Sequence, residues 1–69
     1  MTIFINNQKI EIFRGAMVKD AILRYSKDDY DLLQRGQIMV FDRFGNITEP
    51  DGELTEGQVL YLKKSRIHE

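Results

Sequence analysis

Residues that could perform chemistry are few and scattered in this 69-residue chain. The absence of cysteine excludes disulfides, thiolate zinc sites, cysteine-ligated iron–sulfur clusters and thiol catalysis. His68 is the only imidazole, and it stands next to the last residue, where a general base or metal ligand would be poorly held. Ser26 suits a helix N-cap better than a nucleophile, because the sequence places no base beside it. We therefore expect no catalytic residue, no cofactor and no metal.

Acidic residues are concentrated in two places. Asp28, Asp29 and Asp31 could suggest a cation site, but they lack the alternating ligands and central glycine of a calcium loop. Carboxylates that complement a helix dipole are the simpler interpretation. The region from Phe41 to Gly57 carries five acids against one arginine, a charge of -4, which could attract a basic partner but is more simply a solvated turn region; the acids are Asp42, Glu49, Asp51, Glu53 and Glu56.

The basic residues Lys63, Lys64 and Arg66 form the opposite pole of the chain. They could touch a phosphate or the acidic rim of a partner, but no aromatic platform or glycine-rich cradle accompanies them. The net charge of -1 gives no general attraction to nucleic acid or to an acidic membrane. Nucleic acid is therefore not an expected partner.

Length and composition indicate one small globular domain. Sixty-nine residues are close to the lower limit for folding on a hydrophobic core, and 42% hydrophobic with 30% charged residues is a globular composition. The start has no basic segment before an apolar one, and no apolar run approaches about 18 residues. We expect a cytoplasmic protein without a membrane segment, with residues 1–63 as the domain and residues 64–69 as a flexible tail or the start of a linker.

The first elements are predicted to be a hairpin and two helices. Residues 2–6 and 9–13 alternate as two strands around a turn at Asn7 and Gln8. A helical spacing of apolar residues over 17–25 predicts an amphipathic helix whose start, at Ala16 and Met17, is poorly capped. Ser26 and Asp29 resemble a capping box, which predicts a short second helix over 27–35 that Gly36 stops.

The second half of the chain is predicted to complete a sheet. Residues 38–42 read as a strand, and the Phe44-Gly45-Asn46 turn leads into residues 47–48 as a short further strand. Leu54 is expected to plug the core, and residues 58–63 are predicted to form the last strand. Gly52 and Gly57 precede this strand in turns, where glycine tolerates backbone angles that other residues avoid. This order predicts an α+β domain in which the first and last strands lie parallel.

Three segments resemble the β-grasp (ubiquitin-like) fold and, within it, the thiamin-pathway sulfur carriers: residues 3–8, 15–22 and 51–62. The resemblance spans residues 2–62. It implies a mixed four- to five-stranded sheet wrapped around one main helix, with a short second helix. Since that fold hosts carriers, protein modifiers, ligand-binding modules and ferredoxins, the resemblance leaves the function open.

We expect that the carrier chemistry does not transfer to this chain. Sulfur carriers of that group end in two glycines, because an adenylating enzyme activates the terminal carboxylate. Here the last glycine is Gly57 and the chain ends at Glu69. Met17, where the group commonly has threonine, is a second departure, and the missing cysteines remove the ferredoxin branch.

Strand parity predicts an apolar surface on the sheet. If Ile3, Ile5 and Leu60 face the helix, their neighbours face the other way, together with either Met39 and Phe41 or Ile38 and Val40. An open sheet face in water should be mostly polar, so this one indicates a partner-binding patch, on a face that ubiquitin-like folds often use for recognition. The candidate partner-binding residues are Phe4, Phe13, Met39, Phe41, Tyr61 and Lys63.

These observations favour a non-enzymatic interaction module that binds a protein partner through the open sheet face. The alternative is a degenerate sulfur-carrier-like domain that docks on or regulates an adenylating or sulfur-transfer enzyme without carrying sulfur. Self-association through the same face and a small-ligand module also stay open.

Overall fold

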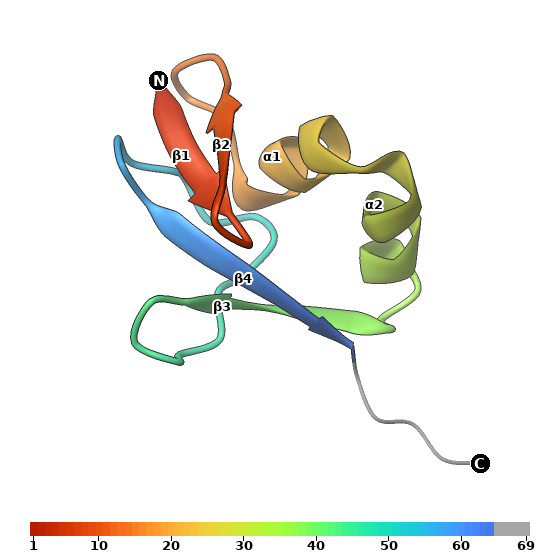
Figure 1. Cartoon of the computed structure of the whole chain (residues 1–69). Coiled ribbons are helices and arrows are strands. Elements are labelled where there is room, and N and C mark those ends of the chain that lie inside the picture. Colours follow the sequence, from red (N-terminus) through yellow and green to blue (C-terminus); the bar gives the residue numbers. More distant parts are fainter. Residues whose placement is uncertain (65–69) are drawn as a thin grey trace, which may run out of the picture.

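The computed structural model describes residues 1–64 and shows an α+β domain, as predicted (Figure 1). Two helices lie on one side of a four-stranded sheet. The predicted tail lies outside the described residues except for Lys64, which belongs to the last strand instead. The elements in chain order are β1 (Thr2–Ile5), β2 (Gln8–Glu11), α1 (Val18–Tyr25), α2 (Lys27–Gln34), β3 (Ile38–Asp42) and β4 (Val59–Lys64).

The sheet is mixed, with the strand order β2-β1-β4-β3. The first and last strands pair in parallel at its centre, Phe4 opposite Val59 and Ile5 opposite Leu60, which confirms the predicted pairing. Both outer pairs, β1 with β2 and β3 with β4, are antiparallel. The long connection between β1 and β4 contains both helices, which supplies the crossover that parallel neighbours require.

The β1–β2 turn is one residue earlier than predicted. Asn6 and Asn7 occupy it with φ of 50° and 70°, and Ile5 pairs with Gln8. A two-residue turn of this hand needs positive φ at both central positions, which asparagine tolerates better than glutamine. The correct turn was therefore the Asn-Asn pair.

A distant loop completes the poorly capped start of α1. The N-cap residue Met17 offers no side-chain oxygen, and the carboxylate of Asp20 accepts a hydrogen bond from the Met17 N–H at 2.9 Å. The N–H groups of Val18 and Lys19 donate to the carbonyls of Gly52 and Pro50, at 2.9 and 3.0 Å. Tertiary contacts thus satisfy donors that a local cap would otherwise take.

Helix α2 begins and ends as its sequence indicates. The Ser26 hydroxyl accepts a hydrogen bond from the Asp29 N–H at 3.2 Å, which is the predicted N-cap. Gly36 follows the helix with φ of 74°, and its N–H donates to the Leu33 carbonyl while Gln37 donates to Leu32. These bonds close the helix at the glycine as predicted.

The further strand expected at residues 47–48 does not form, since Ile47 makes only an isolated bridge to Phe41. Two backbone hydrogen bonds join this returning segment to β3: the Thr48 N–H donates to the Val40 carbonyl, and the Asp42 N–H donates to the Asn46 carbonyl. Gly57 has the positive φ, 79°, that was expected of it. Gly52 does not; a Cβ there would lie 3.1 Å from the Glu49 carbonyl oxygen, so its role is close approach.

The core lies between the helices and the sheet. Leu54 plugs it as predicted, and within residues 1–64 no polar or charged residue is buried. Neither eight-residue helix of this part of the chain has the length and apolar character needed to cross a membrane. The buried apolar residues come from every strand, from α1 and from two loops: Ile3, Ile5, Ile10, Ile12, Ala16, Val18, Ala21, Ile22, Ile38, Val40, Leu54 and Leu60.

Candidate functional site

The sheet surface opposite the helices carries the candidate site, and we call it the open face. Because Ile38 and Val40 are buried beneath the helices, the alternation of β3 turns Met39 and Phe41 outward, which decides between the two predicted parities. The side chains of the open face that concern the site are Phe4, Met39, Phe41, Ile47, Val59, Tyr61 and Lys63.

Strand register places these side chains beside one another. Phe4 lies opposite Val59 across the central parallel pair, and Tyr61 lies opposite Phe41 across the β3–β4 pair. Ile47 lies opposite Phe41 on its other side. Cross-strand partners have Cβ atoms about 5 Å apart, so an apolar band runs from β1 through β4 and β3 to residue 47.

Much of this band is in contact with solvent. Met39 and Tyr61 are 37% and 38% exposed, and Ile47 is 60% exposed. Phe4, Phe41 and Val59 are half-buried. The cation of Lys63, opposite Met39, borders the band at the end of β4.

A shallow hollow of 450 Å³ opens where the band meets the β3 turn. Asn6 closes one side of it: its Oδ1 accepts from the Leu62 N–H at 3.0 Å, and its Nδ2 donates to the Tyr25 hydroxyl at 3.3 Å. The side chain thereby continues the β1 ladder beyond the last residue of that strand. The residues lining the hollow are Asn6, Phe41, Gly45, Tyr61, Leu62 and Lys63.

The lining side chains supply apolar area, one amide, one phenol and one ammonium group. Aromatic rings with a polar end are common in protein contact surfaces because they bury a large area and still hydrogen-bond. Lys63 adds a positive charge at the border, and within residues 1–64 it forms no ion pair. This arrangement suits contact with an apolar surface that carries an acidic edge.

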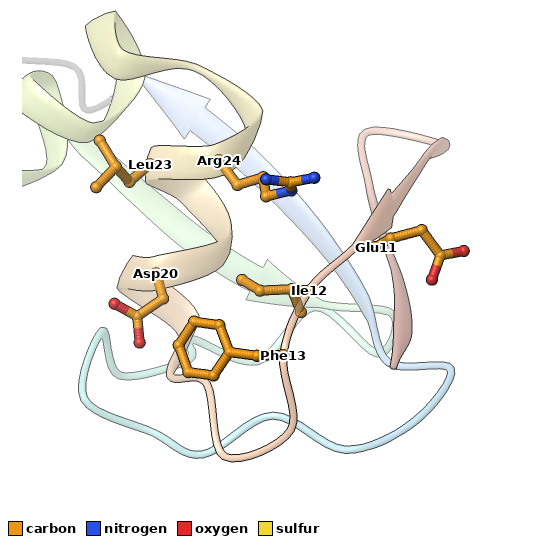
Figure 2. Close-up of a pocket in the computed structure, with 6 residues that line it drawn as sticks. All are labelled: Glu11, Ile12, Phe13, Asp20, Leu23 and Arg24. Carbon is orange, nitrogen blue, oxygen red and sulfur yellow. The ribbon is translucent and has the colours of Figure 1, made fainter.

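Phe13 is not part of the open face, contrary to the prediction. Strand β2 ends at Glu11, and the chain then turns toward α1. The ring of Phe13 lies on the helix side, toward Asp20, and is 63% exposed (Figure 2). Strand parity could not be extended to this residue because the strand stops two residues earlier.

Ile47 is a member of the open face that the predicted site did not include. The signal was present, because the Phe44-Gly45-Asn46 turn returns the chain and brings Ile47 opposite Phe41. Val59, whose parity placed it on this face, also lies in the band. Phe44 itself is 79% exposed at the turn.

Several acids of the region 41–57 have structural roles. Asp42 Oδ1 accepts hydrogen bonds from the N–H groups of Phe44 and Asn46, at 2.8 and 2.9 Å, and holds the turn. Glu56 accepts from the Thr2 N–H at 3.2 Å. Within residues 1–64, no group of three acidic or histidine side chains is placed to hold a metal ion. His68 and Arg66 lie outside the described residues.

Asp51 forms an ion pair with Lys19 at the start of α1. The Lys19 Nζ lies 3.0 Å from the Asp51 Oδ1. This hydrogen bond, and then the opposite charge, raise the pKa of the Lys19 ammonium above its ordinary value of 10.5. The pair joins α1 to the loop that supplies its backbone acceptors, and it lies away from the open face.

Comparison with family models, with curated proteins and with solved structures gave no match to this chain.

Proposed function

We propose that this chain is a β-grasp interaction module that binds a protein partner through the open face. The mixed sheet, with its parallel central pair and the helices on one side, supports the β-grasp assignment. The observation that supports the function is the apolar band, which places three aromatic residues on the face without helices, Phe4, Phe41 and Tyr61.

The argument rests on the cost of exposing such a surface. Apolar area in water is unfavourable by about 25 cal/mol per Å², and a solvated sheet face is ordinarily polar. The band is continuous across three strands, which separates it from the scattered apolar residues found on most surfaces. A partner that covers it gains the free energy of removing this area from water.

The chemistry of the band describes the partner. The expected partner has a binding surface that is apolar at the centre, where it covers Tyr61 and Phe41. This surface carries a carboxylate at its border, where it meets Lys63. Aromatic residues near the centre of an interface are the usual anchors of affinity. Tyr61 lies on the central strand β4, opposite Phe41 and next to Val59 on the same face, so it is the expected anchor.

A photo-crosslinking experiment identifies the partner and tests the site. A photoreactive amino acid at Met39 should capture a protein from an extract of the source cells, whereas the same group at Gln34, exposed on α2, should not. Excess wild-type domain should suppress the capture, and excess Tyr61→Ala domain should not.

Affinity for the captured protein then measures the anchors. Phe4→Ala and Tyr61→Ala should each weaken binding by more than about 1 kcal/mol, or more than about fivefold in Kd. Phe13→Ala is the matched control, since it removes an exposed aromatic ring from the helix side. Equal affinities for the Tyr61, Phe4 and Phe13 variants would reject the open face as the binding surface.

A further inference from the structure

The outer edge of β2 is an unpaired strand edge. β2 is the terminal strand of the sheet, and its other neighbour is β1. The opposite edge, that of β3, is partly covered by residues 46–48, whose backbone bonds to Val40 and Asp42. Within residues 1–64 no loop or side chain bonds to the backbone of Lys9 or Glu11.

The register shows which backbone groups point outward from this edge. The N–H of Ile12 donates to the carbonyl of Met1, and the amino group of Met1 donates back to the Ile12 carbonyl, so this is a hydrogen-bonded pair. Antiparallel pairs alternate, and Thr2 with Glu11 and Phe4 with Lys9 are therefore the non-bonded pairs. The N–H and C=O groups of Lys9 and Glu11 consequently face solvent.

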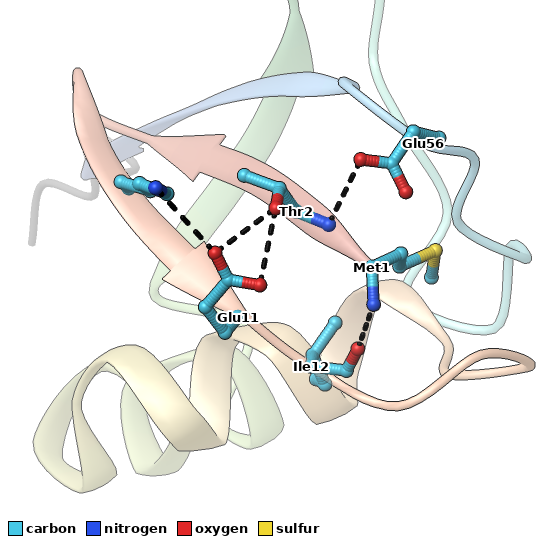
Figure 3. A network of polar contacts seen from close by, with 6 residues as sticks. Met1, Thr2, Glu11, Ile12 and Glu56 are labelled. Carbon is cyan, nitrogen blue, oxygen red and sulfur yellow. Dashed lines mark hydrogen bonds and ion pairs between the residues drawn. The ribbon is translucent and has the colours of Figure 1, made fainter.

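The same two residues carry opposite charges on one side of the strand. The Lys9 Nζ lies 3.6 Å from the Glu11 Oε2, and both side chains are mostly exposed. The Thr2 hydroxyl also donates to the Glu11 carboxylate, and Figure 3 shows this contact. The edge thus presents two outward peptide groups, one with a cationic and one with an anionic side chain.

We infer that β2 pairs with β2 of a second copy of this chain, antiparallel and centred on Ile10. In this register Lys9 of each copy lies opposite Glu11 of the other, so both outward-facing residues form hydrogen-bonded pairs. Each such pair exchanges two backbone bonds and places opposite charges across the strands. The interface is isologous, as in most homodimers.

Repulsion between like charges disfavours the two neighbouring registers. Centring the pairing on Lys9 would place Lys9 opposite itself, and centring it on Glu11 would place Glu11 opposite itself. Like charges directly opposite are destabilising, and charged residues on an edge generally discourage unspecific pairing. The two charges of β2 therefore oppose random edge association and permit the one complementary register.

A hollow between the end of β2 and α1 lies next to this pairing. It has a volume of 660 Å³, and Phe13 and Leu23 are exposed along it (Figure 2). In the proposed register Gln8 of the second copy lies opposite Ile12, which brings the added strand beside this hollow. A twofold axis perpendicular to the sheet also keeps both open faces on the same side, so the dimer would present two partner surfaces together.

The test is a charge swap read by analytical ultracentrifugation from about 10 µM to about 1 mM, since so small an interface is expected to be weak. The wild type should show a monomer–dimer equilibrium. Lys9→Glu and Glu11→Lys should each raise the dimer Kd at least about tenfold, because both charge pairs become repulsive. The double variant Lys9→Glu/Glu11→Lys should restore dimerisation.

Two controls isolate the edge. Lys27→Glu on α2 changes the net charge as Lys9→Glu does and should leave the Kd unchanged, and thermal melts should show that all variants are folded. An equimolar mixture of the two single variants should form a mixed dimer in native mass spectrometry. A wild type that stays monomeric at about 1 mM, or a dimer unaffected by either single variant, would overturn the proposal without bearing on the open face.

Discussion

Leu60 and Tyr61 are neighbours in β4 and have opposite surroundings. The side chain of Leu60 is 0% exposed beneath the helices, whereas that of Tyr61 is 38% exposed on the open face. Both faces of the sheet carry apolar side chains, but only one is covered within residues 1–64. The comparison separates apolar residues that hold the domain together from apolar residues that remain available for contact.

The difference follows from where the helices can pack. The apolar stripe of α1, which includes Val18, Ala21 and Ile22, is fully buried against the sheet. α2 has no fully buried residue, and Leu33 packs against the edge of the same core. With both helices on one side, the aromatic residues of the other side stay exposed or half-buried.

Leu60→Ala should have the largest effect. Removing a fully buried leucine side chain costs about 2–5 kcal/mol, and a domain of this size rarely has more than about 3–5 kcal/mol of stability. We expect the variant to be largely unfolded, as measured by urea denaturation followed by circular dichroism. Cooperative unfolding at the wild-type urea concentration would show that the covered face is not the stabilising one.

Tyr61→Ala should have a much smaller effect on stability. It removes a cross-strand aromatic pair with Phe41, which is worth about 0.2–1 kcal/mol, and leaves the core intact. The same denaturation experiment measures it, with Leu60→Ala as the matched neighbour. If Tyr61→Ala destabilised the domain as much as Leu60→Ala, the open face would be a second core rather than a free surface.

The Lys19–Asp51 ion pair should contribute least, and its contribution should depend on pH. The pKa of Lys19 is raised in the folded state, so the stabilisation is fully present below the unfolded value of 10.5 and is lost as the pH rises through the folded pKa. The melting temperature of the wild type should exceed that of Asp51→Asn at about pH 8, and the difference should shrink toward about pH 11.

The comparison of wild type with Asp51→Asn tests whether this ion pair helps to hold α1 over the covered face. Glu53→Gln is the control, because it neutralises an exposed acid of the same loop region without removing an ion pair of the described residues. A melting difference between wild type and Asp51→Asn that does not change with pH would assign the effect to the loop backbone rather than to the charges.

Much of the fold could be predicted from local signals. The alternation in β1, the helical spacing of α1 and the Ser26 cap each depend on residues a few positions apart, and all three form as predicted. The errors lie where local signals compete or stop. The sequence predicts a turn at Asn7 and Gln8, whereas Asn6 and Asn7 form it, and strand parity predicts an open-face position for Phe13, which lies beyond the end of β2 at Glu11.

The candidate site was only partly predictable. Phe4 and Tyr61 followed from parity within strands whose buried face was clear. Met39 and Phe41 required knowledge of which side of β3 faces the core, and Ile47 required the return of the chain after the turn. These choices depend on contacts between segments far apart in the sequence.

The sequence by itself determined the class of domain, the two helices, the parallel pairing of the first and last strands, and the lack of cysteine chemistry. Periodicity, capping residues and composition suffice for these, because each reports local conformation or residue type. Only the tertiary structure decided the orientation of β3, the place of Phe13, the cap of α1 by residues 50–52, and the unpaired edge of β2. Those features depend on how hydrogen-bond donors, acceptors and apolar surfaces of distant segments meet, which no single segment specifies.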